Sequence, residues 1–149
     1  MNIRVIDHNV NVIAMEKNGK NYGMCCAWAM QVADDKLMCA LGPQSDTGKA
    51  LGAGDLVGFS NLKKGQEDIA FKLGDMNRHS AEADKLAGIA CHTEEGAILI
   101  DGARAEAKCK VIEVLHLQQN EKENIVYLQI LDGKKNEGEA LRMSDLTKS

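Results

Sequence analysis

A strand-like run that ends in an Asn-Gly pair is the feature that most constrains this chain. Residues 10–16 have the alternating pattern of a strand, and Asn18-Gly19 follows almost at once. Asn-Gly suits the two positive φ angles of a type I′ turn, whose twist matches that of antiparallel strands. Residues 22–33 are therefore predicted to be the returning strand of a β-hairpin.

The rest of the chain continues this pattern of short strands separated by turn residues. Further strands are predicted over residues 36–41, 56–62, 97–100, 103–117 and 124–131, with a turn at 120–123. Helices are predicted over residues 48–51, 66–73 and 80–87, and residues 141–146 are predicted to be a terminal helix or a loose tail. The predicted fold class is mainly β with helical insertions, in the form of a β-barrel.

The strand over 103–117 shows the clearest two-sided pattern. Ala105, Ala107, Cys109 and Val111 are predicted to face one side, and Arg104, Glu106, Lys108 and Lys110 the other. The phase slips at Val111-Ile112, which predicts a β-bulge there.

Length and charge exclude several classes of protein. The 149 residues fit a single domain, 1–149. The net charge is −4 and basic residues are scattered, so no nucleic-acid partner is expected. No run of 18 apolar residues is present, so no membrane span is expected. Residues 1–11 lack the apolar core of a signal peptide, which predicts a cytoplasmic protein.

The five cysteines and four histidines do not predict a metal site. Cys25-Cys26 and Cys91-His92 are adjacent pairs, and neighbouring residues on a strand point to opposite faces. The spacing of a structural zinc site is also missing. The odd cysteine count predicts reduced thiols. Cys25 or Cys26 as a redox thiol stays open beside the simpler interpretation, a buried strand cysteine.

A possible anion site follows the strand over 36–41. Gly42-Pro43 ends that strand, and the next four residues, 44–47, suit the start of a helix. Backbone amides with the hydroxyls of Ser45 and Thr47 could hold a phosphate, and Lys49 could add a positive charge. A plain helix cap is the alternative, because each such contact contributes only about 0.3–1 kcal/mol when exposed.

Seven segments together resemble one known family. They are residues 22–32, 41–47, 58–62, 66–70, 83–88, 97–103 and 109–111. The first is similar to the motif NGMTASWVTQV, and the second to the loop IRPSRYT, of the flavin reductase-like domain. The others match further motifs of that family in the same order. The fold of this family is the FMN-binding split barrel.

The resemblance implies a homodimer that binds FMN near the subunit interface, with NADH or NADPH as a possible electron donor and a redox protein as a possible partner. It implies FMN contacts from ten residues of this chain: Cys25, Cys26, Ala27, Trp28, Gly42, Gln44, Ser45, Thr47, Lys49 and Ser60. The first four would lie along the flavin ring, and the loop 42–47 would hold the phosphate. The flavin supplies the chemistry of such a protein, so no catalytic residue is named.

Because of substitutions in these motifs, three interpretations of the function stay open. Cys25 and Ala27 replace a threonine and a serine, and Gly42 and Ser45 replace two arginines. Asn124 replaces a histidine that many flavin reductases use near the nicotinamide, and an amide cannot titrate. The chain could therefore be an FMN-dependent oxidoreductase, an electron carrier that never uses NAD(P)H, or a relative that has lost flavin.

Overall fold

The computed structural model describes residues 3–42, 46–74, 84, 86–116 and 124–146. It contains the predicted β-hairpin. Strand β1 (Asn11–Lys17) pairs with β2 (Lys20–Cys26), with Lys17 opposite Lys20. Asn18 and Gly19 have φ values of 54° and 77°, the two positive angles that the turn requires.

The predicted strand over 22–33 is wrong as one element, because it is two strands with different partners. β2 ends at Cys26, and β3 (Ala29–Ala33) begins three residues later and pairs with β4 (Lys36–Leu41). The chain thus changes partners at Ala27-Trp28.

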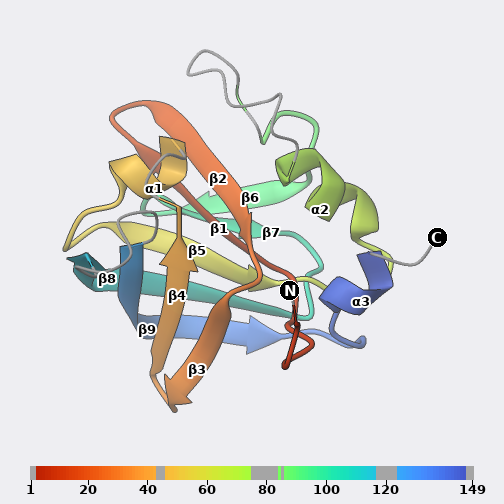
Figure 1. Cartoon of the computed structure of the whole chain (residues 1–149). Helices are drawn as coiled ribbons and strands as arrows, with labels where there is room; N and C mark the ends of the chain where they lie inside the picture. Colours follow the sequence, from red (N-terminus) through yellow and green to blue (C-terminus); the bar gives the residue numbers. More distant parts are fainter. Residues whose placement is uncertain (1–2, 43–45, 75–83, 85, 117–123, 147–149) are drawn as a thin grey trace.

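All strands of the described chain belong to one antiparallel sheet (Figure 1). The remaining ones are β5 (Leu56–Asn61), β6 (Cys91–Glu94), β7 (Ala97–Ile100), β8 (Ala105–His116) and β9 (Asn124–Lys135). The order is β3-β4-β9-β8-β5-β1-β7-β6, and β2 pairs with β1 beside this path. Strand β6 was not predicted, and β9 is four residues longer than predicted.

Three short helices complete the described structure: α1 (Asp46–Ala50), α2 (Glu67–Leu73) and α3 (Met143–Leu146). Figure 1 shows α2 and α3 near each other on one side of the sheet, while α1 lies beside β2 at another end. The helix predicted over 80–87 lies largely outside the described residues, and the turn over 120–123 lies wholly outside them. Within the described chain, none of the helices has the length and hydropathy to cross a membrane.

The core has two parts separated by the sheet. Ile13, Cys39 and Leu128 belong to the cluster between the strands of the barrel, and Phe59 lies at one end of it. The second cluster joins the outer face of β1 to α2 and includes Val12, Leu73 and Leu141. Both clusters are mainly aliphatic. The end of β2 contacts both clusters, since Cys26 belongs to the first and Cys25 packs against the second.

In strand β8, one sequence prediction is wrong and another is confirmed. Glu106, predicted on the polar face, is buried, with 3% of its surface exposed. The pairing of β8 with β9 shifts register between Val111 and Glu113, which confirms the predicted bulge. A second shift lies between Lys108 and Cys109.

Candidate functional site

The point where the chain changes partners is built by backbone hydrogen bonds. Ala29 N–H donates to the Ala27 carbonyl at 2.9 Å, which makes a tight turn between β2 and β3. Ala40 N–H on β4 donates to the Trp28 carbonyl at 2.8 Å. These bonds hold β4 against the turn, and they leave the Trp28 side chain 55% exposed.

An apolar pocket of about 410 Å³ lies at this turn, and we call it the crossover pocket. Its lining is Val10, Cys25, Cys26, Ala27, Trp28, Ala40, Ala70, Phe71, Gly74, Met143 and Leu146. Residues 25–28, which the family resemblance implies as flavin contacts, thus line one pocket together with side chains of α2 and α3. The volume falls in the range of small-molecule sites, which are lined mainly by apolar groups.

The two neighbouring cysteines of the crossover pocket differ in their surroundings. Cys25 is half-buried, and its Sγ–H donates to the Ala70 carbonyl of α2 at 3.3 Å. Cys26 is buried, with its Sγ 3.7 Å from the Trp28 carbonyl and 3.9 Å from that of Ala40. Both thiols thus have carbonyl oxygens beside them, which accept hydrogen bonds from a thiol and do not stabilise a thiolate.

The predicted phosphate loop starts next to the crossover pocket. Gly42 is half-buried and lies two residues after Ala40, which lines the pocket. Gln44 and Ser45 lie outside the described residues. Thr47 in α1 is buried, with 3% of its surface exposed, and its carbonyl accepts from Leu51 N–H at 3.2 Å.

Lys49 and Ser60 lie apart from the crossover pocket. Lys49 is exposed and lines another hollow of about 480 Å³ with His116 and the buried Asn124. Ser60 is fully buried, and its Oγ accepts a hydrogen bond from Ile100 N–H at 3.0 Å. This hydrogen bond links β5 to β7, so the Ser60 hydroxyl oxygen already has an acceptor role within the chain.

The other cysteines are kept as thiols by burial. No disulfide joins the five cysteines. The hydrogen bond with Cys26 and burial together raise the pKa of Cys39 well above its usual value. Burial raises the pKa of Cys109 to about 12. Among the described residues, no group of three or more His, Cys, Asp and Glu side chains is placed to hold a metal ion.

Sequence reasoning missed the part of the crossover pocket that comes from distant segments. Phe71, Met143 and Leu146 line it beside the predicted residues. They come from α2 and α3, and each of the three follows Trp28 by more than 40 residues. No local pattern could place them there, because a ligand pocket at a junction of elements depends on tertiary packing.

Comparison with known proteins gives one family and a consistent fold. The model of the family described as "Flavin reductase like domain" matches residues 3–145. No curated protein matches this chain.

Among solved structures, the NADH:FAD oxidoreductase SgcE6 of Streptomyces globisporus C-1027 has a TM-score of 0.78 and 19% identity. The match covers 88% of this chain and 77% of that one. A second structure of SgcE6, in complex with NAD and FAD fragments, has a TM-score of 0.75 and 21% identity, covering 88% and 76%. A flavoredoxin of Methanosarcina acetivorans has a TM-score of 0.77 and 16% identity, covering 91% and 73%. At such identities these likenesses establish the fold.

Proposed function

Because the chain belongs to the flavin reductase-like domain family, we propose that it is a flavoprotein that binds FMN at the crossover pocket and transfers electrons through it. The observation that carries this proposal is the change of strand partners at Ala27-Trp28. That change opens an apolar pocket at the four residues for which the family resemblance implies contact with the ring.

The residues present suit a flat heteroaromatic group. The pocket wall is apolar, and aromatic rings gain most from contact with such surfaces. Cys26, Ala27 and Trp28 would lie along the ring. Gly42, Gln44, Ser45 and Thr47 would hold the phosphate, mainly through backbone amides and hydroxyls. Lys49 would contribute a positive charge from outside the pocket.

Ser60 has a different role in this proposal. Its hydroxyl is bonded to Ile100 N–H, so Ser60 would act by fixing β5 against β7 behind the site rather than by a direct contact.

Bound FMN supplies the ability to accept a hydride and to pass electrons on singly or in pairs. The chain would position the ring, keep water from one of its faces with Phe71, Met143 and Leu146, and orient the phosphate. Among the described residues that line the crossover pocket, we assign none as an acid or a base, since they are apolar side chains, two thiols and glycine. We therefore propose no catalytic residue.

The test of flavin binding is the visible absorption spectrum of the purified chain, before and after FMN is added and the excess removed. The proposal predicts a two-band flavin spectrum. A chain that stays colourless would instead support a relative that has lost flavin. Ala27→Glu places a charge in the pocket and should lower FMN affinity about tenfold or more, whereas Ala90→Glu, at an exposed position just before β6, should leave it unchanged.

A second candidate is an electron carrier that does not react with NADH or NADPH. The neutral Asn124, where the family's motif has a titratable histidine, favours it, as does the likeness to a flavoredoxin. Anaerobic mixing of the FMN-loaded chain with each nicotinamide separates the two. Rapid loss of the flavin colour indicates an oxidoreductase, and an unchanged colour that a reduced redox protein can bleach indicates a carrier.

We also propose that the chain works as a homodimer in the cytoplasm. An apolar groove of about 770 Å³ adjoins the crossover pocket at Trp28 and Ala40, and Met30 and Ile125 line it as well. Trp28 and Met30 are more than half exposed. Exposed apolar surface of this extent is typical of an interface, and the groove is continuous with the proposed flavin site.

A further inference from the structure

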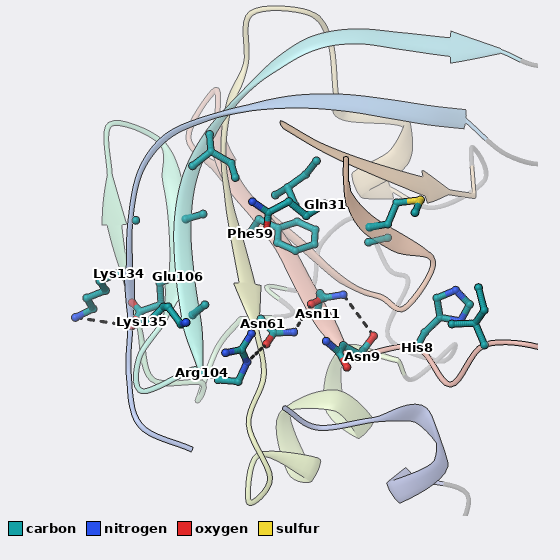
Figure 2. Close-up of a pocket in the computed structure, with 18 of the residues that line it drawn as sticks. His8, Asn9, Asn11, Gln31, Phe59, Asn61, Arg104, Glu106, Lys134 and Lys135 are labelled. Carbon is teal, nitrogen blue, oxygen red and sulfur yellow. Dashed lines mark hydrogen bonds and ion pairs between the residues drawn. The ribbon is translucent and has the colours of Figure 1, made fainter. Parts of the chain in front are cut away.

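A separate cavity of about 770 Å³ opens at the mouth of the barrel, and we call it the barrel mouth. Strands β1, β3, β4, β5, β8 and β9 contribute to its lining, together with residues 6–9 (Figure 2). It shares no lining residue with the crossover pocket. It does share Ile6, His8, Ala29 and Met30 with the groove proposed as the dimer interface, and the proposed flavin function gives its other lining residues no role.

The inner wall of the barrel mouth is apolar. Phe59 and Leu37 are each 7% exposed, and the half-buried Ala107 and Ile130 lie beside them. Figure 2 places the Phe59 ring at the centre of the cavity. This surface can receive an apolar or aromatic body.

The rim is a chain of amides that ends on an arginine. Asn11 Nδ2 donates to the Cys26 carbonyl at 3.1 Å, which leaves its Oδ1 to accept from Asn61 Nδ2 at 2.8 Å. Asn61 Oδ1 then accepts from Arg104 Nε at 2.7 Å. Each amide is oriented by the one before it, and the guanidinium is therefore held in a defined place at the rim (Figure 2).

The terminal nitrogens of Arg104 remain available for a ligand. In the part of the chain that the structure describes, no carboxylate lies within ion-pair distance of Arg104 or Lys135. Lys134 differs, because its Nζ lies 3.7 Å from Glu106 Oε2. Arg104 and Lys135 thus line the barrel mouth with no ion-pair partner among the described residues. The carboxylates in the lining are those of Asp7, which accepts from Ser144, and Glu106.

We propose that the barrel mouth binds a small carboxylate with an apolar or aromatic body. The body lies against Phe59 and Leu37, and the carboxylate accepts paired hydrogen bonds from the Arg104 guanidinium, with Lys135 adding positive charge. Planar guanidinium groups suit carboxylates because two parallel N–H···O bonds form at once. Mouths of β-barrels are common places for such ligands.

Glu106 does not reverse this preference for an anion. Its Oε2 accepts from Asn136 Nδ2 at 2.8 Å and faces Lys134. Its Oε1 lies 3.7 Å from His92 Nε2, on the side of a small separate hollow that both residues line. Oε2 is thus paired within the chain, whereas Oε1 has no hydrogen-bond partner among the described residues and faces His92.

The test uses 2-naphthoate and its neutral counterpart 2-naphthamide as probes, with binding to the full chain measured by calorimetry or by shifts of NMR signals. We expect naphthoate to bind about tenfold more tightly than naphthamide, because only the carboxylate engages Arg104. Arg104→Gln keeps a donor for Asn61 but loses the charge, and it should weaken naphthoate binding by a similar factor. Lys110→Gln, at an exposed position of β8, makes the same change of charge and should have no effect.

The failure of this proposal is distinguishable from failure of the flavin proposal. Flavin content should be the same in the wild-type chain and in Arg104→Gln. Equal binding of the two probes, unchanged naphthoate binding by a folded Arg104→Gln variant, or no binding at all would overturn the carboxylate site. Displacement of naphthoate by FMN would also overturn it, because the barrel mouth would then belong to the flavin site.

Discussion

At the scale of single residues, burial sets the reactivity of the cysteines. The pKa of Cys109 is about 12 because the thiol is buried, and that of Cys39 is also raised well above its usual value. At pH 8 a thiol with a pKa near 12 holds about a thousandfold less thiolate than one near 8.5. Iodoacetamide should therefore leave Cys39 and Cys109 unmodified in the folded chain and modify all five cysteines in denaturant, as mass spectrometry can show.

Labelling of Cys109 at the rate of an exposed thiol would contradict this prediction. Cys91 is a useful internal comparison. Burial raises its pKa also, but the residue is only half-buried, so we expect it to react faster than Cys109.

Gly58 shows how one residue sets the spacing of two strands. A Cβ atom at this position of β5 would lie 1.8 Å from the Ile98 carbonyl oxygen of β7, so any side chain must push the strands apart. Gly58→Ala should lower the free energy of unfolding by roughly 3 kcal/mol or more, or prevent folding. Gly52→Ala is the matched control, since the nearest atom there is 3.8 Å away. Urea unfolding of both variants tests this, and equal stability of the two would refute it.

At the scale of elements, two hydrogen bonds join the N-terminal segment to α3. Asp7 Oδ2 accepts from Ser144 Oγ at 2.7 Å, and Asp7 Oδ1 accepts from Ser144 N–H at 3.1 Å. These hydrogen bonds lower the pKa of Asp7 from its usual value of 3.8. A lowered pKa means that the ionised form is favoured in the folded chain. The stabilisation is therefore fully present above the usual pKa and is lost as the pH falls through the lowered one.

Hydrogen exchange of α3 should follow this titration. We expect the amides of residues 143–146 to exchange faster, relative to their intrinsic rates, below pH 3 than at pH 5, while those of β8 keep their protection. Asp7→Asn should show the faster exchange at both pH values. Because Met143 and Leu146 line the crossover pocket, the same variant should bind FMN more weakly. Equal protection of α3 at both pH values in the wild-type chain would be evidence that the Asp7–Ser144 hydrogen bonds do not stabilise α3.

The elements that sequence could predict are those whose signals are local. Asn18-Gly19 supplies its own turn geometry, so the β1–β2 hairpin was predictable from two residues. Strand β6 was missed because its turn to β7 places Glu95, which is not a usual turn residue, at a φ of 53°. The break at Ala27-Trp28 was missed for a different reason. Its cause is the bond from Ala40 N–H, which belongs to another strand.

In the candidate site too, the residues with a local sequence signal were predictable and those brought in by tertiary packing were not. Residues 25–28 could be predicted because they are consecutive and carry the family motif. Their partners from α2 and α3 could not, and neither could the burial of Glu106, which a strict two-sided pattern places on the polar face. That residue is buried because Asn136 and Lys134 of the chain beyond β8 supply its hydrogen bond and its charge partner.

At the scale of the whole molecule, the exposed apolar surface near the proposed flavin site is the remaining feature to explain. Strand β3 is the end of the sheet order, and both Met30 and Val32 on it are exposed, at 63% and 41%. In Figure 1 this strand lies at the edge of the molecule, close to the N-terminal segment that carries Ile3 and Val5. An open apolar strand edge promotes association with another chain. In the proposed homodimer it is covered by a second copy.

Met30→Glu should therefore separate the dimer and weaken FMN binding together, because a charge in an apolar interface stays unpaired. Light scattering after size-exclusion chromatography should give half the mass of the wild-type assembly, and FMN titration should show a loss of affinity of about tenfold or more. Ile112→Glu, an exposed apolar position at the bulge of β8, is the matched control and should remain dimeric. A monomeric variant with full flavin affinity would show that one copy completes the site. A wild-type chain that is itself monomeric would leave β3 as the open edge of a single subunit and refute the dimer.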